Sequence, residues 1–158
     1  MSELQSPGEL DDLIVLIENW VHRFAIETDW VLAVDRGTSD DTSFGEPRWY
    51  VRMAGEAKDI ITVWLTLGQR TFRYETYVMP APEENIEAVF DQLLRRNDRL
   101  VGAHFSIGAE DAVYLRGELP DHAVTEAELD RVVGTLYATV EQAFRPLLQL
   151  GFASRFAD

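Results

Sequence analysis

The sequence predicts an α+β domain in which helices pack on an antiparallel β-sheet, in the order α-β-β-β-β-α-β-β-α. Two observations predict this class. In three long segments apolar residues recur every three or four positions, the period of an amphipathic helix, whereas in the other segments they alternate or form short β-branched runs. The strand segments also follow one another in groups separated by single helices, which favours an antiparallel sheet over a parallel α/β arrangement.

Length and composition predict a single domain over residues 1–158. A chain of this length with 46% hydrophobic and 11% aromatic residues can build one ordinary core without disulfides. The sequence contains no cysteine, which excludes thiolate metal sites and cysteine nucleophiles. Its start lacks a basic, apolar signal segment, and no apolar run approaches the roughly 20 residues that span a bilayer. We therefore expect a cytoplasmic protein with no membrane partner.

The charge is strongly acidic, with 28 Asp and Glu against 14 Lys and Arg and a net charge of −14. Such a surface repels the phosphates of nucleic acids and anionic lipids, so we expect no nucleic-acid partner. Solubility is the simplest explanation of the acidic surplus, and a basic partner is the alternative.

The first helix begins with a capping-box pattern. Ser6 can accept a hydrogen bond from the Glu9 amide, Glu9 can reach back, and Pro7 is tolerated at the first helical position. The apolar stripe that follows consists of Leu10, Leu13, Ile14, Ile17, Trp20, Val21 and Phe24. We expect this helix to end near Glu27 or Thr28.

Four strands are predicted next. They cover residues 30–35, 48–54, 60–67 and 70–79. The polar segment 36–47 is expected to be a loop, and Gly68 and Gln69 a tight turn. In the last strand apolar and charged residues alternate, so one face of the sheet should contact solvent.

A second helix, a hairpin and a third helix complete the chain. Pro80 and Pro82 should end the strand and start the helix, with Glu83 and Glu84 in its first turn. Its apolar stripe consists of Ile86, Val89, Phe90, Leu93, Leu94 and Leu100. After Gly102, residues 103–107 and 112–119 read as a hairpin around 108–111. Thr125 and Glu128 form a second capping box, and the long helix should kink or end at Arg145-Pro146.

The second half of the chain resembles the bacterial YbjN-like family. The resemblance rests on YVMPAP at 77–82, LLRRNDRLVGAHFSIGAEDAVYLRGELP at 93–120, VTEAEL at 124–129 and PLLQLGF at 146–152. It implies a fold similar to that of type III secretion chaperones, capable of forming a homodimer and of binding extended protein segments. The family is described as sensory-transduction regulators. It provides no catalytic residue that could be assigned in this chain.

Local motifs for chemistry are missing from the sequence. It contains no GxSxG, Walker or GxGxxG pattern, and His22, His104 and His122 lack metal-ligand spacing. We therefore expect no catalytic residue, no metal site and no cofactor. The loop could chelate calcium through the side-chain oxygens of Asp35, Thr38, Ser39, Asp40 and Asp41. Their order fails the EF-hand spacing, which favours a solvated loop.

The first candidate binding residues lie late in the second helix. Arg95, Arg96 and Arg99 are the largest basic cluster of an acidic chain and could bind an acidic partner; the alternative is that they interact with the helix dipole and nearby carboxylates. Asn97 continues the apolar stripe, and a buried amide needs partners. We expect it to tie the helix end to a neighbouring backbone; the smaller alternative is a role in dimer register.

The second candidates are aromatic residues of the strands. Trp49, Tyr50, Trp64, Phe72, Tyr74 and Tyr77 cannot all point to one face, because neighbouring residues alternate. Core packing is the simpler explanation for most of them. If Tyr50, Trp64 or Tyr77 is exposed, an apolar patch would mark a dimer or peptide surface.

The function predicted from these features is a non-enzymatic protein-binding module, chaperone-like or regulatory, which binds a protein partner through an exposed sheet or helix surface. The alternative is a small-ligand sensor or an unrecognised enzyme. That alternative predicts an enclosed pocket with convergent polar groups, so pocket geometry separates the two hypotheses.

Overall fold

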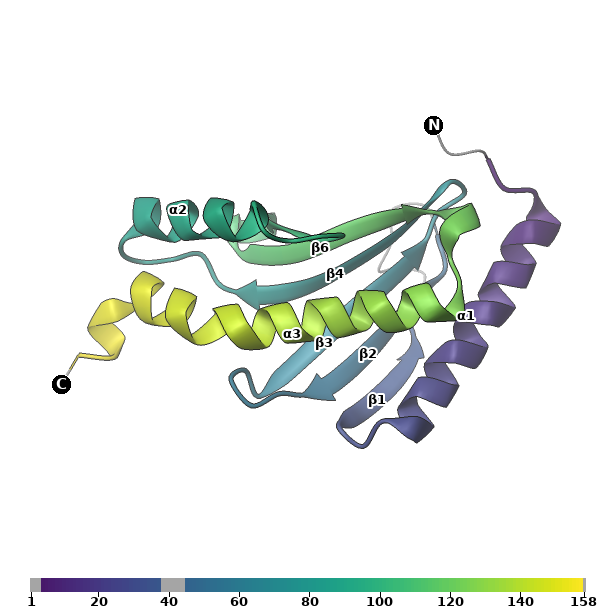
Figure 1. The fold of residues 1–158 in the computed structure, drawn as a ribbon, viewed down its shortest axis with the longest axis horizontal. Helices are drawn as coiled ribbons and strands as arrows, with labels where there is room; N and C mark the ends of the chain where they lie inside the picture. Colours follow the sequence, from purple (N-terminus) through teal and green to yellow (C-terminus); the bar gives the residue numbers. More distant parts are fainter. Residues whose placement is uncertain (1–3, 38–44, 158) are drawn as a thin grey trace.

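A computed structural model describes residues 4–37 and 45–157 (Figure 1). The helices are α1 (Pro7–Glu27), α2 (Ile86–Asn97) and α3 (Glu126–Gly151). The strands are β1 (Val31–Arg36), β2 (Arg48–Ala54), β3 (Ile60–Leu67), β4 (Thr71–Met79), β5 (His104–Ile107) and β6 (Val113–Pro120). They form one antiparallel sheet in the order β1-β2-β3-β4-β6-β5. The predicted α+β class and element order are confirmed.

The start of α1 has the predicted capping box. The Ser6 amide donates to Glu9 Oε2 at 2.7 Å and the Glu9 amide donates to Ser6 Oγ at 3.3 Å, which satisfies two amides that the helix leaves unpaired. Further along, Trp20 is fully buried and its indole Nε1 donates to Asp130 Oδ1 at 2.8 Å. This bond joins α1 to α3.

One face of the sheet is buried under the helices. In Figure 1, α3 crosses in front of the central strands, and it contacts β3, β4 and β6 as well as the two other helices. The buried side chains of this face include Trp49, Val51, Met53, Ile61, Val63, Leu65, Phe72, Tyr74, Val113 and Leu115. Side chains at the alternate positions are mostly half-buried or exposed, as a period of two requires.

The start of α2 differs from the prediction. The helix begins at Ile86, and its N-cap Asn85 has a left-handed conformation with φ 50°. Glu83 and Glu84 precede the helix, because both their amides donate to the carbonyl of Gly151 at the end of α3, each at 2.9 Å. The Glu84 carboxylate also accepts from the Ser154 amide at 2.8 Å. Tertiary contacts with α3 therefore outweigh the local signal for a helix start.

Two features of α3 also differ from expectation. The Thr125 hydroxyl caps the Glu128 amide at 3.1 Å, but the Glu128 carboxylate pairs with Arg131 instead of reaching back to close the box. The helix continues past Pro146 to Gly151, so an end at Pro146 was wrong. Gln142, whose carbonyl loses its usual donor to the proline, is exposed, and water can take the place of the missing amide.

Asp121 is a buried carboxyl at the junction of β4 and β6. It opens the short 3₁₀ helix η3 (Asp121–Ala123), and its amide donates to the Arg70 carbonyl at 2.9 Å. The side chain is fully buried, and neither carboxylate oxygen has a hydrogen-bond partner among the described residues. Burial, reinforced by Glu46, raises the pKa of Asp121 to about 6, against a smaller opposing effect of His122.

This geometry predicts that Asp121 destabilises the fold above pH 6. Because its pKa is higher in the folded than in the unfolded chain, its contribution to stability is fully present below about pH 4 and is lost as pH rises through about 6. Asp121→Asn should therefore become more favourable, relative to wild type, by about 1 kcal/mol between pH 5 and pH 7.5. Urea unfolding at both pH values measures this, and an unchanged difference would contradict it.

Candidate functional site

The sheet face opposite α3 carries the candidate aromatic side chains. All three helices belong to the other side of the sheet, because α1 and α2 both pack against α3. The strand register places one residue from each strand side by side across this open face. From one sheet edge to the other they are Asp35, Tyr50, Trp64, Glu75, Arg116 and His104.

Tyr50 and Trp64 form the aromatic part of this row. Their ring centroids lie 5.4 Å apart in an edge-to-face arrangement, and both side chains are half-buried. The Arg48 guanidinium lies 4.0 Å from the centroid of the Trp64 ring, within the range of a cation–π interaction. The predicted exposure of these two aromatics is thus partial, and their solvent-facing edges belong to one cluster.

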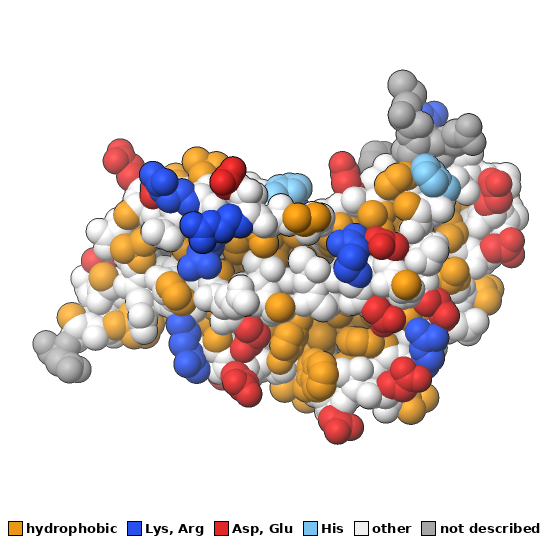
Figure 2. Space-filling model, in the orientation of Figure 1, with side chains coloured by type: hydrophobic (Ala, Val, Ile, Leu, Met, Phe, Trp, Pro, Cys, Tyr) orange, Lys and Arg blue, Asp and Glu red, His pale blue; other side chains and the backbone are white. Residues whose placement is uncertain are grey.

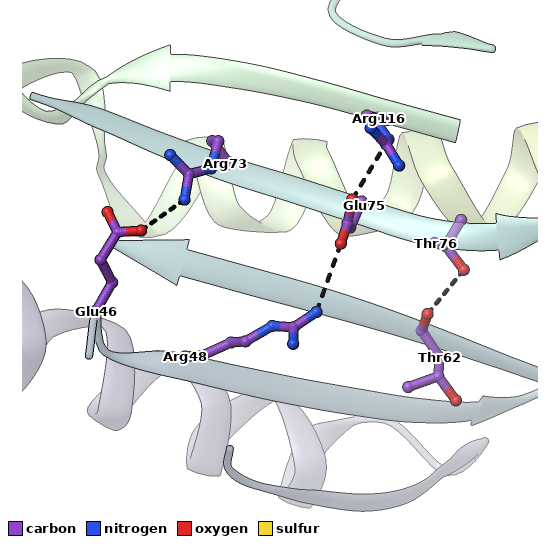
Figure 3. Close-up of polar contacts among 7 residues, drawn as sticks. All are labelled: Glu46, Arg48, Thr62, Arg73, Glu75, Thr76 and Arg116. Carbon is purple, nitrogen blue, oxygen red and sulfur yellow. Dashed lines mark hydrogen bonds and ion pairs between the residues drawn. The ribbon is translucent and has the colours of Figure 1, made fainter. Parts of the chain in front are cut away.

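Next to the aromatics, Glu75 lies between two arginines (Figure 3). Its Oε1 is 3.4 Å from Arg48 Nη2, and its Oε2 is 3.3 Å from Arg116 Nε. The Arg116 guanidinium also lies 4.7 Å from the centroid of the Tyr114 ring. In this half-exposed setting each ion pair contributes modestly to stability, but together they hold the guanidinium planes against the aromatic rings.

Figure 3 also draws two neighbouring contacts of these strands. At one end of the strands, Arg73 Nη2 pairs with Glu46 Oε1 at 2.7 Å. On the covered face, next to Glu75 in the sequence, the Thr76 hydroxyl donates to the Thr62 carbonyl at 2.7 Å and satisfies a fully buried polar side chain.

Tyr77 belongs to a separate aromatic pair. It faces Tyr114 across the β4–β6 ladder, with ring centroids 5.6 Å apart, and 41% of its surface is exposed. Desolvation, with smaller effects of Tyr114 and Glu110, raises the pKa of the Tyr77 phenol. The structure thus brings Tyr50 and Trp64 together and places Tyr77 with a partner that was not among the candidates.

Four residues of the open face were missed by the sequence reasoning: Arg48, Glu75, Tyr114 and Arg116. The period of two gave a partial signal, because Arg48 and Tyr50 must share a face, as must Glu75 and Tyr77. Their meeting across strands depends on register, which the sequence pattern of single strands does not specify.

The arginine candidates lie on a different surface. Figure 2, which looks onto the helical side, shows Lys and Arg side chains gathered over α2. Arg95 is exposed and donates from Nε to Asp91 Oδ2 at 2.9 Å, and Arg96 is half-buried. Arg99 is exposed and follows the end of α2, so its predicted place within the helix was wrong. Beside them, α2 exposes an apolar stripe of Ile86 (47%), Phe90 (38%) and Leu94 (70%). Basic and apolar groups therefore share the outward side of this helix.

Asn97 ties α2 to the edge strand β5. Its Nδ2 donates to the Phe105 carbonyl at 3.1 Å, and the Phe105 amide donates to its Oδ1 at 2.7 Å. The predicted link between the helix end and a neighbouring backbone is confirmed. The side-chain amide pairs with both backbone groups of Phe105 on the outer edge of β5, as a neighbouring strand would, so it blocks strand pairing at that point.

One hollow in the described residues bears on the small-ligand hypothesis. A half-open hollow of about 140 Å³ lies between α1 and the first two strands, lined by Glu18, Val21, His22, Asp35, Arg36 and Trp49. Among the residues with described positions, no group of three or more His, Asp and Glu side chains could hold a metal ion. Of the calcium candidates, Thr38, Ser39, Asp40 and Asp41 lie outside the described residues. No helix of the described chain could span a membrane.

Sequence comparison identifies a family. The model of the YbjN family, described as "Putative bacterial sensory transduction regulator", matches residues 14–149. An uncharacterized protein of Mycobacterium tuberculosis is 39% identical over 108 residues, which cover 68% of this chain and 59% of that protein. An uncharacterized protein of Mycobacterium leprae is 35% identical over 107 residues, which cover 68% and 58%. The chain spans about three fifths of the length of the curated relatives it matches.

Structure comparison identifies the fold. A chain of the heterodimeric ExoU–SpcU complex, from the type III secretion system of Pseudomonas aeruginosa, has a TM-score of 0.52 and 14% identity, covering 83% of this chain and 96% of that one. A chain of the Yersinia pestis structure of the type III secretion chaperone SycH, in complex with a stable fragment of YscM2, has a TM-score of 0.47 and 17% identity. The match covers 77% of this chain and 94% of that one. The first likeness supports the fold predicted from the sequence.

The geometry of Asn97 predicts a measurable loss of stability. Asn97→Ala leaves the Phe105 amide and carbonyl without partners at a partly buried edge, which should reduce the free energy of unfolding by about 1–3 kcal/mol. The control is Gln92→Ala, which removes an exposed amide from the same helix and should change little. Urea unfolding of both variants provides the test, and equal effects would show that the Asn97 bonds add nothing.

Proposed function

This chain belongs to the YbjN family, and we propose that it is a non-enzymatic protein-binding module, chaperone-like or regulatory, whose partner docks on the open face of the sheet. The observation that carries the proposal is the Tyr50–Trp64 pair beside the Arg48–Glu75–Arg116 cluster, on a face that no described helix covers. Aromatic and arginine side chains are the residue types enriched at protein interfaces and their hot spots.

Two further considerations favour a protein partner. The matching fold in the ExoU–SpcU structure occurs in a complex of two proteins. The net charge of −14 disfavours nucleic acid and anionic membranes, whereas on the open face Glu75 locally offsets the charge of the arginines. We also propose that the protein is located in the cytoplasm.

The half-open hollow beside α1 gives the small-ligand alternative less support than an enclosed pocket would.

We also propose that α2 forms the contact of a homodimer. Its first half carries Glu87 and Asp91, its last turn carries Arg95 and Arg96, and Arg99 follows just after the helix. In a two-fold antiparallel contact the acidic half of each helix faces the basic half of the other, so the surface is complementary to itself. The exposed stripe of Ile86, Phe90 and Leu94 would be buried between the two helices.

The partner surface is tested by one tryptophan substitution and its matched control. Trp64→Ala removes the centre of the aromatic cluster, whereas Trp30→Ala removes a half-exposed tryptophan next to β1, outside the cross-strand row. Affinity capture with mass spectrometry identifies partners of the wild type, and titration then gives Kd. We expect Trp64→Ala to weaken binding about tenfold or more and Trp30→Ala to leave it unchanged. Equal affinities of all three proteins would contradict the open-face proposal.

The dimer contact is tested by light scattering. Wild type should have the mass of two chains, and Leu94→Asp should have the mass of one, because a carboxylate in the apolar stripe would be buried without a partner. Val15→Asp on α1, also at an exposed apolar position, is the control and should remain a dimer.

Replacing Arg95, Arg96 and Arg99 with Gln tests the basic cluster and should weaken the dimer. If the triple variant loses partner binding while it stays a dimer, the cluster binds the partner instead. A monomeric wild type would overturn the dimer.

A further inference from the structure

Lys58 is the only lysine in the sequence; every other basic side chain counted among the 14 Lys and Arg is arginine. A guanidinium stays protonated at any physiological pH, whereas an ammonium can lose a proton and become a nucleophile. Lys58 is therefore the one side-chain amine that this chain can offer to an electrophile.

The Lys58 ammonium lies where three segments meet. It belongs to the turn 55–59 between β2 and β3, and its Nζ donates to the Tyr77 carbonyl of β4 at 2.6 Å. Nζ is also 5.0 Å from the centroid of the Tyr77 ring and 5.8 Å from that of Phe144 on α3. The side chain is half-buried, so the amine is close to apolar surface and still within reach of solvent.

The turn that carries Lys58 is held in one conformation by α3. The amides of Glu56, Ala57 and Lys58 all donate to the Glu141 carboxylate, at 2.9, 2.8 and 3.3 Å. Gly55 has no room for a Cβ atom, which would collide with the Lys58 carbonyl and the Glu141 carboxylate. The amine is thus positioned in advance, as a reactive group needs to be.

The electrostatic setting of Lys58 differs from that of several arginines. Arg36, Arg48, Arg116 and Arg155 each lie over an aromatic ring and also contact a carboxylate. Lys58 lies over aromatic rings, yet among the described residues no carboxylate oxygen is within 4.0 Å of its Nζ. Desolvation without a counter-charge lowers the pKa of Lys58 to about 8.

We propose that Lys58 is a site for reversible imine formation with small neutral carbonyl compounds. The Nζ lone pair attacks the carbonyl carbon, a C–N bond forms, and the C=O π pair moves to oxygen, which takes a proton. The resulting carbinolamine loses one water as the C=N bond forms and nitrogen releases its proton. No electron is gained or lost, and hydrolysis reverses the step. Charge selects the electrophile: Glu56, Asp59 and the net charge of −14 disfavour anionic acyl donors but not neutral aldehydes.

The test uses the full chain, propanal as the probe, and borohydride to trap the imine as a stable propylamine. Peptide mass mapping then locates the label, and N-acetyl-lysine amide in the same solution is the reference. At pH 7.4 a pKa near 8 gives a free-amine fraction about 200-fold larger than that of an ordinary lysine. A less basic amine is also a weaker nucleophile, as it is for thiols, so we expect labelling about tenfold faster than the reference.

Two variants and one condition make the result decisive. Lys58→Arg keeps the cation over the rings and should abolish the label in this segment. Phe144→Ala lets water reach the amine, and because desolvation is what lowers the pKa of Lys58, the pH midpoint of labelling should shift toward that of the reference amine. Unfolding the wild type in urea should remove the rate advantage while leaving Lys58 accessible. The proposal is overturned if folded Lys58 reacts no faster than the reference at pH 7.4, or if its labelling rises only near pH 10.

Discussion

The burial of one sheet face under α3 is the interaction on which the rest of this structure depends. The apolar side chains of α3 fill the core against the strands; among them are Leu129, Val133, Leu136 and Val140. Because side chains alternate along a strand, covering one face commits the intervening positions to the other. The row from Asp35 to His104 follows from this alternation, because its residues occupy the strand positions between those that point into the core.

The same helix positions the other surfaces through polar contacts at its C-terminal half. Glu141 holds the turn that carries Lys58, and the Gly151 carbonyl accepts the amides of Glu83 and Glu84, which sets where α2 begins. Phe144 also provides one of the rings beside the Lys58 amine. One element thus supports the core, the start of the proposed dimer helix and the reactive turn, so changes in α3 would affect all three together.

Sequence periodicity predicted the elements better than it predicted their partners. The bounds of β2 and β3 match the prediction, because β-branched runs between turn residues leave little freedom. Glu83 and Glu84 led to a wrong prediction of the helix start. Acidic residues before a helix give the same sequence pattern whether they lie in its first turn or their amides donate to a distant carbonyl. The meeting of Tyr50 with Trp64 depends on register, and the ladders contain irregularities, as at Val31/Ala33 and Tyr77/Met79, that no local pattern specifies.

The choice between arginine and lysine explains how an acidic chain uses its few cations. A guanidinium is planar, so Arg48 can lie over Trp64 and contact Glu75 at the same time, and Arg116 does the same with Tyr114 and Glu75. Such paired cations stabilise a surface but are chemically inert. A half-buried ammonium without a carboxylate partner has a lowered pKa because burial disfavours the charged form, and this is the state of Lys58. Arginine thus occupies the positions where a cation contacts both a ring and a carboxylate, whereas the single lysine lies over rings with no carboxylate oxygen of the described residues within 4.0 Å of its Nζ.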